Sequence, residues 1–219
     1  NLPFKSNSFP FVFIYESLHH FPNPKPILTE IERVLLPGGC LLIGSDPIKP
    51  SLQFPVWRRP NKLRFWEKIL KYFLILPFIS QIGKTETEYG VIETAFTLKT
   101  WQKSLSIFKK VESEIGVYPF GPIEKIQGTN PSMVTRFGLF IFGGGIRATC
   151  FKEGKIKQSS RKNILICPNC LSHNQQEPQL RSMGSVFHCL VCQNKYSKIK
   201  GILVLMDKKL QAKILNLPL

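Results

Sequence analysis

Four cysteines in the last third of the sequence form two CxxC pairs. Cys167 and Cys170 make the first pair, Cys189 and Cys192 make the second, and eighteen residues separate the pairs. Each pair can place two thiolates on one side of a tetrahedral ion, and this separation is typical of four-cysteine zinc sites. Four protein ligands complete the coordination sphere. The spacing therefore predicts a structural zinc ion rather than a catalytic one.

Two disulfide bonds or a redox-active CxxC are the alternatives to zinc. The first residues show no secretory leader, and Cys40 and Cys150 have no evident partners, so we expect a reducing, cytoplasmic environment. A redox role for one pair would leave the other pair unexplained. His173 and His188 lie near the cysteines, but four thiolates suffice, so we expect both histidines at the surface or next to the ligands.

A second group of reactive side chains follows the apolar run FVFIY at residues 11–15. Tyr15, Glu16 and Ser17 come at its end, and the adjacent His19 and His20 follow shortly after. Such groups can bind a metal, transfer a proton or line a ligand site. The competing interpretation is that one histidine starts the next helix and the other packs or faces solvent. His19 and His20 are the candidate catalytic residues.

The elements around this group predict a parallel sheet. The run FVFIY has the character of a strand buried on both faces. Asn23, with prolines at 24 and 26, predicts a helix start, and apolar residues then recur at helical spacing to Leu35. We expect the Pro-Gly-Gly at 37–39 to end that helix and CLLIG at 40–44 to form a second buried strand. Strand, helix and strand in this order form a βαβ unit.

Residues 51–100 differ in character and are predicted to be an inserted helical lid. The apolar run YFLILPFI at 72–79 is too short to span a bilayer, so no transmembrane segment is predicted. We expect its amphipathic helix to pack on the core, with a position along a membrane surface as the alternative. Candidate groups for holding an anionic or aromatic acceptor in this segment are Trp57, Arg58, Arg59, Arg64 and Trp66.

The second half of the chain predicts further elements and a boundary. A capped helix from Thr97 or Thr100, a strand near 111–118 and an apolar strand at 136–145 would complete the sheet. We expect a first domain over 1–150, a basic linker over 151–163, a zinc module over 164–206 and a tail over 207–219. A module this small would draw much of its folding free energy from the metal.

The charge of the chain is strongly basic and uneven. Lysine and arginine number 30 against 14 acidic residues, and residues 151–219 carry twelve against three. Such a basic end favours an anionic partner, either RNA or a membrane surface, and a peripheral membrane location is compatible with it. The alternative is a basic surface that binds no partner.

Residues 2–47, from LPF to GSDP, resemble the second half of class I S-adenosylmethionine-dependent methyltransferases, in the branch that methylates small molecules, quinones and some RNAs. Residues 97–145 continue the resemblance weakly. It implies an α/β fold with a partial Rossmann-like sheet. It also implies S-adenosylmethionine as cofactor, with Leu2, Pro3 and Phe4 against the adenine and Tyr15, Glu16 and Ser17 near the methionine part. Ligands of open α/β sheets bind outside the carboxyl ends of the strands, which agrees with this placement.

The sequence departs from the family pattern in its cofactor motifs. The Gly-rich loop after the first strand and the acidic residue after the second strand are not found, and we expect the natural N-terminus to lie upstream. Pro10 stands where the family usually has an aspartate at the start of the fourth strand. Residues 166–206 are similar to the small zinc ribbons that partner methyltransferases, in which a tyrosine such as Tyr196 follows the second cysteine pair.

Together these features predict a methyltransferase segment with a helical insertion and a four-cysteine zinc ribbon. The acceptor of the methyl group would be a small molecule, a lipid-like molecule or an RNA. The alternative is a module without catalytic activity, in which the α/β part supports a basic zinc ribbon that binds RNA or a protein.

Overall fold

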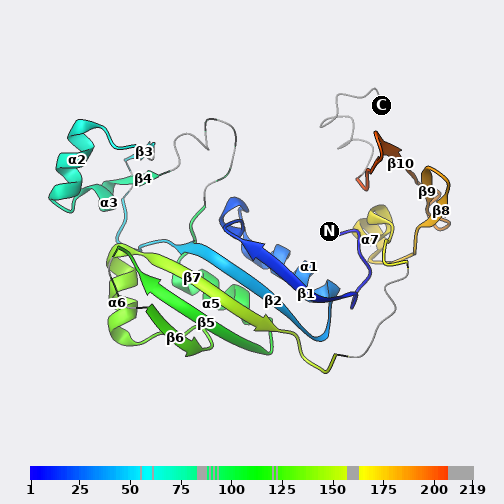
Figure 1. The fold of residues 1–219 in the computed structure, drawn as a ribbon, viewed down its shortest axis with the longest axis horizontal. Helices are drawn as coiled ribbons and strands as arrows, with labels where there is room; N and C mark the ends of the chain where they lie inside the picture. Colours follow the sequence, from blue (N-terminus) through cyan, green and yellow to red (C-terminus); the bar gives the residue numbers. More distant parts are fainter. Residues whose placement is uncertain are drawn as a thin grey trace.

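The computed structural model describes residues 1–54, 56–60, 62–82, 88, 90, 92, 94–119, 121, 123–156 and 163–206. A central sheet with its helices lies between two smaller units. One holds α2 and α3, and the other holds α7 and β8 to β10 (Figure 1). The candidate catalytic residues His19 and His20 follow the first strand of the central sheet.

The predicted βαβ unit is present. Strands β1 (Phe9–Tyr15) and β2 (Leu35–Ile48) pair in parallel and are joined through helix α1 (Pro24–Val34). The side chain of Asn23 accepts a hydrogen bond from the Lys25 amide at 3.0 Å, as an N-cap should. The helix ends earlier than predicted, because Leu35 pairs with Phe9 and the Pro-Gly-Gly segment already belongs to β2. Tertiary pairing thus overrides the expected helix stop.

Strand β1 is not buried on both faces, which corrects the prediction. It lies at one edge of the sheet, whose order is β1-β2-β7-β5-β6. Alternate side chains point to opposite faces of a strand, and Phe11 and Phe13 are 51% and 54% exposed. Val12 and Ile14, on the opposite face, pack against the core. The aromatic face of β1 is therefore about half exposed to solvent.

The remaining strands of the sheet are antiparallel. Strand β7 (Gly144–Phe151) pairs with β2 on one side and with β5 (Lys110–Val117) on the other, and β6 (Ile123–Gln127) pairs with β5. Helix α5 (Leu98–Leu105) starts at Thr97, as predicted, and contributes the fully buried Trp101 to the core. The expected helix and following strand are therefore confirmed. With the parallel β1–β2 pair, this arrangement is the predicted α/β class.

Residues 136–145 do not form the predicted strand. Helix α6 (Met133–Phe142) occupies most of them, and its N-cap Ser132 accepts a hydrogen bond from the Thr135 amide at 3.3 Å. Strand β7 begins only at Gly144, where a Cβ would collide with the Gly116 carbonyl oxygen of β5. The composition of this apolar run is compatible with either a strand or a buried helix. The N-cap at Ser132 favours the helix.

The segment after β2 forms a separate small unit. It contains the parallel pair β3 (Trp57–Arg59) and β4 (Ser80–Ile82), with helices α2 (Phe65–Tyr72) and α3 (Leu76–Ile79) between them. The helix predicted in the run 72–79 packs only in part, because Leu76 is buried while Tyr72, Phe73 and Leu74 are 83%, 64% and 65% exposed. Whether this unit acts as a lid stays a prediction. None of the helices in the described ranges has the length and apolar character needed to cross a bilayer.

The cysteine-rich end has its own small sheet. Helix α7 (Pro168–Asn174) precedes strands β8 (Arg181–Met183), β9 (Val186–His188), β10 (Lys195–Ile199) and β11 (Ile202–Leu203) in the order β11-β10-β9-β8. We call residues 163–206 the ribbon. The division of the chain into domains stays a prediction, and residues 157–162 of the predicted linker and the tail 207–219 lie outside the described residues.

Candidate cofactor rim and metal centre

The carboxyl ends of β1 and β2 lie side by side, and a bulge in β2 shapes this rim. Ile43 pairs with Ala148 of β7, but Asp46 pairs with Ile146, so one extra residue is inserted. Ser45 adopts the left-handed conformation with φ of 55° at this point. A bulge shifts which side chains face inward. Consequently Asp46 continues the buried face of Leu41 and Ile43, and its side chain is fully buried.

A histidine meets this buried carboxylate. The short 3₁₀ helix η1 (Leu18–His20) follows β1 and is anchored by the fully buried Leu18. His19 Nδ1 lies 2.8 Å from Asp46 Oδ1, and the His19 amide donates to the same oxygen at 3.2 Å. The second oxygen, Asp46 Oδ2, is buried without a hydrogen-bond partner among the described residues. The Asp46 carboxylate thus orients the His19 imidazole, and its second oxygen still lacks a hydrogen-bond donor among the described residues.

His20 lies beside this pair. Its ring centroid is 4.1 Å from that of His19, and His20 Nδ1 is 2.9 Å from the Ile92 carbonyl oxygen. On sequence alone, His19 and His20 were equal candidates for a catalytic role. Of the two, only His19 is hydrogen-bonded to the buried carboxylate in the contacts above. Sequence reasoning missed Asp46, although an acidic residue just after an apolar strand, next to a histidine-bearing strand end, is a usable signal.

The residues predicted to contact the methionine part lie at this same rim. Tyr15 pairs with Gly44, and its ring covers that glycine so closely that a Cβ there would collide with it. The Glu16 amide donates to the Gly44 carbonyl at 2.9 Å, and Glu16 itself has φ of 45°. Ser17 Oγ donates to the Tyr15 carbonyl at 2.6 Å. Glu16 and Tyr15 are exposed, and a cofactor role for all three stays a prediction.

The residues predicted to contact the adenine form a short extended segment held by α1. Arg33 donates from its guanidinium to the carbonyl oxygens of Leu2 at 3.0 Å and Phe4 at 2.9 Å. Glu30 accepts from the Leu2 amide at 2.9 Å. The Phe4 ring meets the Phe9 ring edge to face at 5.1 Å. Leu2, Pro3 and Phe4 are each partly exposed, and their contact with a cofactor stays a prediction.

The ribbon binds the same segment from its other side. Phe4 forms an antiparallel bridge with Leu165, the Lys5 amide donates to Ile164 at 2.8 Å, and the Ile166 amide donates to Pro3 at 3.1 Å. Glu177 accepts from the Ser6 amide at 2.9 Å, and Arg33 is 2.8 Å from the same carboxylate. Helix α7 accordingly lies beside the N-terminal segment (Figure 1). The segment is therefore fixed between α1 and the ribbon.

Replacing Arg33 with alanine should loosen this segment. The guanidinium holds two main-chain carbonyls and two carboxylates, and hydrogen bonds to charged groups are worth about 1.5–3 kcal/mol each. We expect faster amide hydrogen exchange at residues 2–6 and 164–166 and a loss of about 2 kcal/mol of unfolding free energy. Lys125→Ala breaks the exposed pair with Glu114 and serves as the matched control, with a change below about 0.5 kcal/mol.

The same contact should weaken in acid. Burial alone would raise the pKa of Glu177, but hydrogen bonds from Ser6 and the charge of Arg33 hold that pKa below its ordinary value. A lowered pKa means that the stabilisation is complete above the ordinary glutamate range and is lost as pH falls through the folded-state value. Faster exchange at residues 164–166 should therefore appear below about pH 4.5. Unchanged exchange in Arg33→Ala would contradict this description of the contact.

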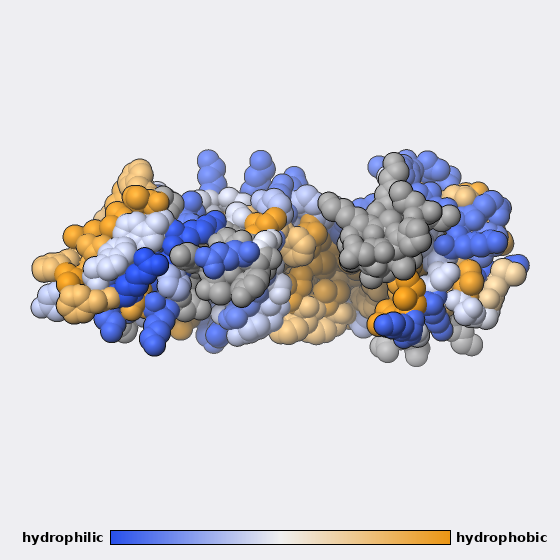
Figure 2. Space-filling model, turned by 90° about the horizontal axis from the view of Figure 1, so that it is seen from above, coloured by the Kyte–Doolittle hydropathy of each residue, from blue (hydrophilic) through white to orange (hydrophobic). Residues whose placement is uncertain are grey.

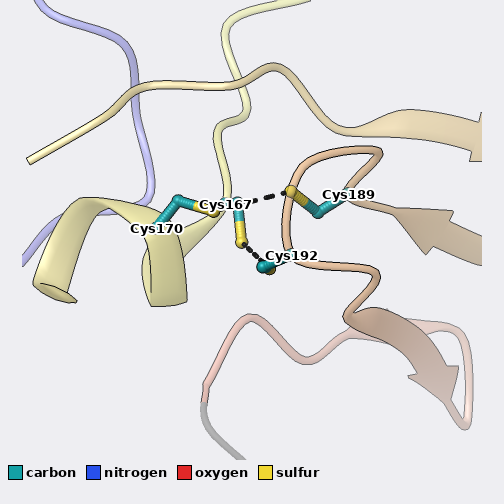
Figure 3. A group of neighbouring side chains, drawn as sticks. All are labelled: Cys167, Cys170, Cys189 and Cys192. Carbon is teal, nitrogen blue, oxygen red and sulfur yellow. Dashed lines mark hydrogen bonds between the residues drawn. The ribbon is translucent and has the colours of Figure 1, made fainter. Parts of the chain in front are cut away.

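The four predicted metal ligands come together. Cys167 and Cys170 project from the start of α7 toward Cys189 and Cys192, which lie in the turn between β9 and β10 (Figure 3). Cys167 Sγ is 3.5 Å from Cys192 Sγ, and Cys170 Sγ is 3.7 Å from Cys189 Sγ. All four sulfurs lie within 4.8 Å of one another. Zinc–sulfur bonds of about 2.3 Å in a tetrahedron put sulfurs about 3.8 Å apart, and a disulfide would need about 2.05 Å.

Burial and neighbouring polar groups shift the pKa values of the cysteine thiols. Burial raises the pKa of the Cys170 thiol. Burial would also raise the pKa of Cys192, but the Asn194 amide and the other thiols lower it to about 7. The Tyr196 hydroxyl lies 3.1 Å from Cys167 Sγ. Among the described residues the cluster contains only cysteines, since His173 is exposed and His188 lies outside it.

Two surface clefts lie elsewhere. One, of about 460 Å³, is on the sheet face of β5, β6 and β7, and its walls carry Glu112, Glu114, Lys125 and Arg147. The other, of about 630 Å³, follows the end of β2 and is lined by Lys49, Lys99, Gln102 and Arg136. Neither includes His19 or Asp46. Some of the residues predicted to hold the methyl acceptor lie close together in the unit that contains α2. The ring centroids of Trp57 and Trp66 are 5.2 Å apart, and Arg59 donates a hydrogen bond to Ser80 Oγ.

Comparison with known proteins gives matches for the N-terminal part of the chain. Residues 1–43 match the family model of a methyltransferase domain. The chain is 45% identical over 60 residues to a demethylmenaquinone methyltransferase from Lactiplantibacillus plantarum, covering 26% of this chain and 25% of that protein. It is 42% identical over 50 residues to the 27-O-demethylrifamycin SV methyltransferase from Amycolatopsis mediterranei, covering 23% and 18%.

Among solved structures, the chain is similar to a SAM-dependent methyltransferase from Methanosarcina mazei. The identity is 21%, the coverage is 71% of this chain and 64% of that one, and the TM-score is 0.37. A TM-score this low does not by itself establish a common fold. The chain spans about a quarter of the length of the demethylmenaquinone methyltransferase that it matches.

Proposed function

We propose that this chain is part of an S-adenosylmethionine-dependent methyltransferase that methylates a hydroxyl-bearing small molecule or lipid-like acceptor. The observation that carries this proposal is the match of residues 1–43 to a methyltransferase domain, combined with the His19–Asp46 pair at the carboxyl ends of β1 and β2. The similar proteins are named for demethylmenaquinone and for 27-O-demethylrifamycin SV. A non-enzymatic module would have no need for a buried carboxylate beside an imidazole, because burying a charge is costly.

The residues at the rim suit a cofactor with an apolar base and a polar amino-acid end. Leu2, Pro3 and Phe4 would face the adenine, and Tyr15, Glu16 and Ser17 would contact the methionine part. The exposed Glu16 offers an acceptor to cationic or hydroxyl groups at this edge. When bound, S-adenosylmethionine supplies an electrophilic methyl group on a sulfonium.

His19 is the proposed general base. Asp46 Oδ1 accepts the proton on His19 Nδ1, and in that tautomer Nε2 is the basic nitrogen of the ring. With the cofactor supplying the methyl group, His19 Nε2 would take the proton of the acceptor hydroxyl. The negative charge of Asp46 stabilises the resulting imidazolium. The protein's contribution is thus alignment of acceptor and methyl group, together with removal of one proton.

We further propose that the four cysteines bind a structural zinc ion. Support comes from an all-sulfur donor set, sulfur spacing close to that of a zinc tetrahedron, and the absence of any open ligand position in such a set. The ion would hold α7 against the turn between β9 and β10. Through the bridge from Leu165 to Phe4 it would also fix the segment predicted to contact the adenine.

Isothermal titration with S-adenosylmethionine tests the activity at its first step. The protein should be expressed from the natural start of its reading frame, and we expect binding in the micromolar range, about −8 kcal/mol. S-adenosylhomocysteine should compete, and ATP, which shares the adenosine, should not. Absence of heat with both S-adenosyl ligands would refute the methyltransferase function. The basic RNA-binding module would then be the remaining alternative, and it should show affinity that falls steeply with salt.

A further inference from the structure

The helix α2 presents its apolar side to solvent. Phe65, Ile69 and Tyr72 recur at positions i, i+4 and i+7, which places them on one face of the helix. They are 80%, 45% and 83% exposed. The opposite face carries Glu67, which is fully buried. A helix of a globular domain normally has the reverse arrangement, with its apolar face inward.

Hydrogen bonds explain why the charged residue is inside. Glu67 accepts from the Trp57 indole Nε1 at 3.2 Å and from the Arg64 amide at 2.8 Å. Those bonds, led by the one from the Arg64 amide, hold the pKa of Glu67 below its ordinary value. The carboxylate thereby fixes α2 to β3 through polar contacts. The orientation of the apolar face toward solvent is therefore built into the unit.

The apolar face continues beyond the end of α2. Phe73, Leu74 and Ile75 are 64%, 65% and 45% exposed, and Phe54 and Val56, which precede β3, are 72% and 77% exposed. Figure 2 shows hydrophobic atoms spread over the end of the molecule that carries α2 and α3, with hydrophilic atoms between them. Exposed apolar patches of this kind mark interaction sites.

The charges around this face are almost all positive. Residues 54–79 contain six lysines and arginines, and their one acidic residue is the buried Glu67. Lys68 and Lys71, three residues apart, lie along one border of the apolar face, and Lys62 and Arg64 precede the helix; all four are exposed. Aromatic residues with a flanking row of cations are the composition of helices that lie in the headgroup region of a membrane.

We propose that the α2 face, defined as Phe65, Trp66, Ile69, Tyr72 and Phe73 with Lys68 and Lys71, binds the surface of a bilayer that contains anionic lipid. The aromatic side chains would enter the boundary between headgroups and acyl chains, and the lysines would contact lipid phosphates. A second copy of the chain is less suited to this face, because two such basic surfaces would repel each other. The binding does not depend on the proposed methyl transfer, although it would bring the chain to a lipid-like acceptor.

Vesicle sedimentation tests the inference. The full chain is mixed with vesicles of phosphatidylcholine alone or of phosphatidylcholine with phosphatidylglycerol, and the bound fraction is measured. We expect binding to the mixed vesicles that weakens as salt is added. The double variant Phe65→Glu with Tyr72→Glu should lower the partition coefficient roughly tenfold or more, since both side chains are exposed and the fold does not need them. Lys68→Glu with Lys71→Glu should abolish the preference for phosphatidylglycerol.

Ile202→Glu is the matched control. Ile202 is 71% exposed on β11, in the ribbon at the opposite end of the molecule, and its substitution should leave vesicle binding unchanged. Circular dichroism should show that each variant keeps the wild-type fold. The proposal is overturned if the wild-type chain does not bind the mixed vesicles, or if the Phe65/Tyr72 variant binds them as well as the wild type. A third outcome would also overturn it: the wild type forms a dimer by light scattering, the Phe65/Tyr72 variant is a monomer, and neither of the two binds vesicles.

Discussion

Cys170→Ser is expected to abolish zinc binding and to unfold the ribbon while the central sheet stays folded. Wild-type protein should contain equimolar zinc, and the variant none after dialysis. Structural zinc contributes about 10–16 kcal/mol in small cysteine-rich modules, more than the few buried apolar residues of the ribbon can supply. Those residues are few, with Leu180 and Tyr196 packed on the four cysteines.

Hydrogen exchange with mass spectrometry and metal analysis provide the measurement. Backbone amides of β9 and β10 should lose protection in Cys170→Ser, and so should residues 2–6, because Pro3 and Phe4 pair with the ribbon. The backbone amides of β2 and β7 should keep their protection from exchange. Cys40→Ser, in β2 and outside the cluster, is the control that should retain zinc. A zinc-free wild type with a protected ribbon would contradict the metal assignment.

Acidification should release the zinc for the same chemical reason. Burial raises the pKa of the Cys170 thiol, so without the metal this ligand is protonated at neutral pH. Protons and zinc therefore compete for the sulfurs, and the apparent zinc affinity should fall as the pH is lowered.

His19→Ala is expected to lower kcat by roughly 10²–10⁴-fold, the usual contribution of a general base. Its affinity for S-adenosylmethionine should change little, because the imidazole is assigned to the acceptor proton rather than to the cofactor. His20→Ala is the matched control. Its ring contacts the His19 ring but bonds to the Ile92 carbonyl, so we expect less than about a tenfold loss. Equal losses in the two variants would exclude a specific role for His19.

Asp46→Asn distinguishes a positioning role from a purely structural one. The amide keeps the shape of the carboxylate but removes the negative charge beside the ring. Since that charge favours the protonated imidazole, the acidic limb of the pH–rate profile should move to lower pH in the variant. The kcat should fall while thermal unfolding shows the protein still folded. A lower kcat with an unshifted profile would mean that Asp46 only supports the fold.

The cluster of four cysteines is the part of the protein that sequence spacing predicted most fully. Two residues between the cysteines of each pair are enough to bring both sulfurs to one ion, whatever the surrounding fold. The βαβ unit was predictable for a similar reason, because Asn23, the following prolines and the apolar periodicity act within one helix and its neighbours. Both patterns depend on contacts that are local in the chain.

The His19–Asp46 pair and the orientation of α2 were not predictable in this way. Asp46 turns inward only because a bulge against β7 adds one residue to β2, and β7 lies about a hundred residues further along the chain. The exposed face of α2 reflects the hydrogen bonds that draw Glu67 inside, which the sequence pattern does not reveal. The α6 helix was predicted as a strand because its apolar run fits both structures until Ser132 caps it.

The sequence by itself determined the grouping of the four cysteines, the parallel pairing of the first two strands and the polar groups at the end of β1. Each of these follows from the chemistry and spacing of residues close together in the chain. Tertiary structure alone decided which histidine meets a carboxylate, which helix face is exposed, and that the ribbon holds Leu2 to Phe4 against α1. Those outcomes depend on strand register and on contacts between distant segments, which local patterns do not encode.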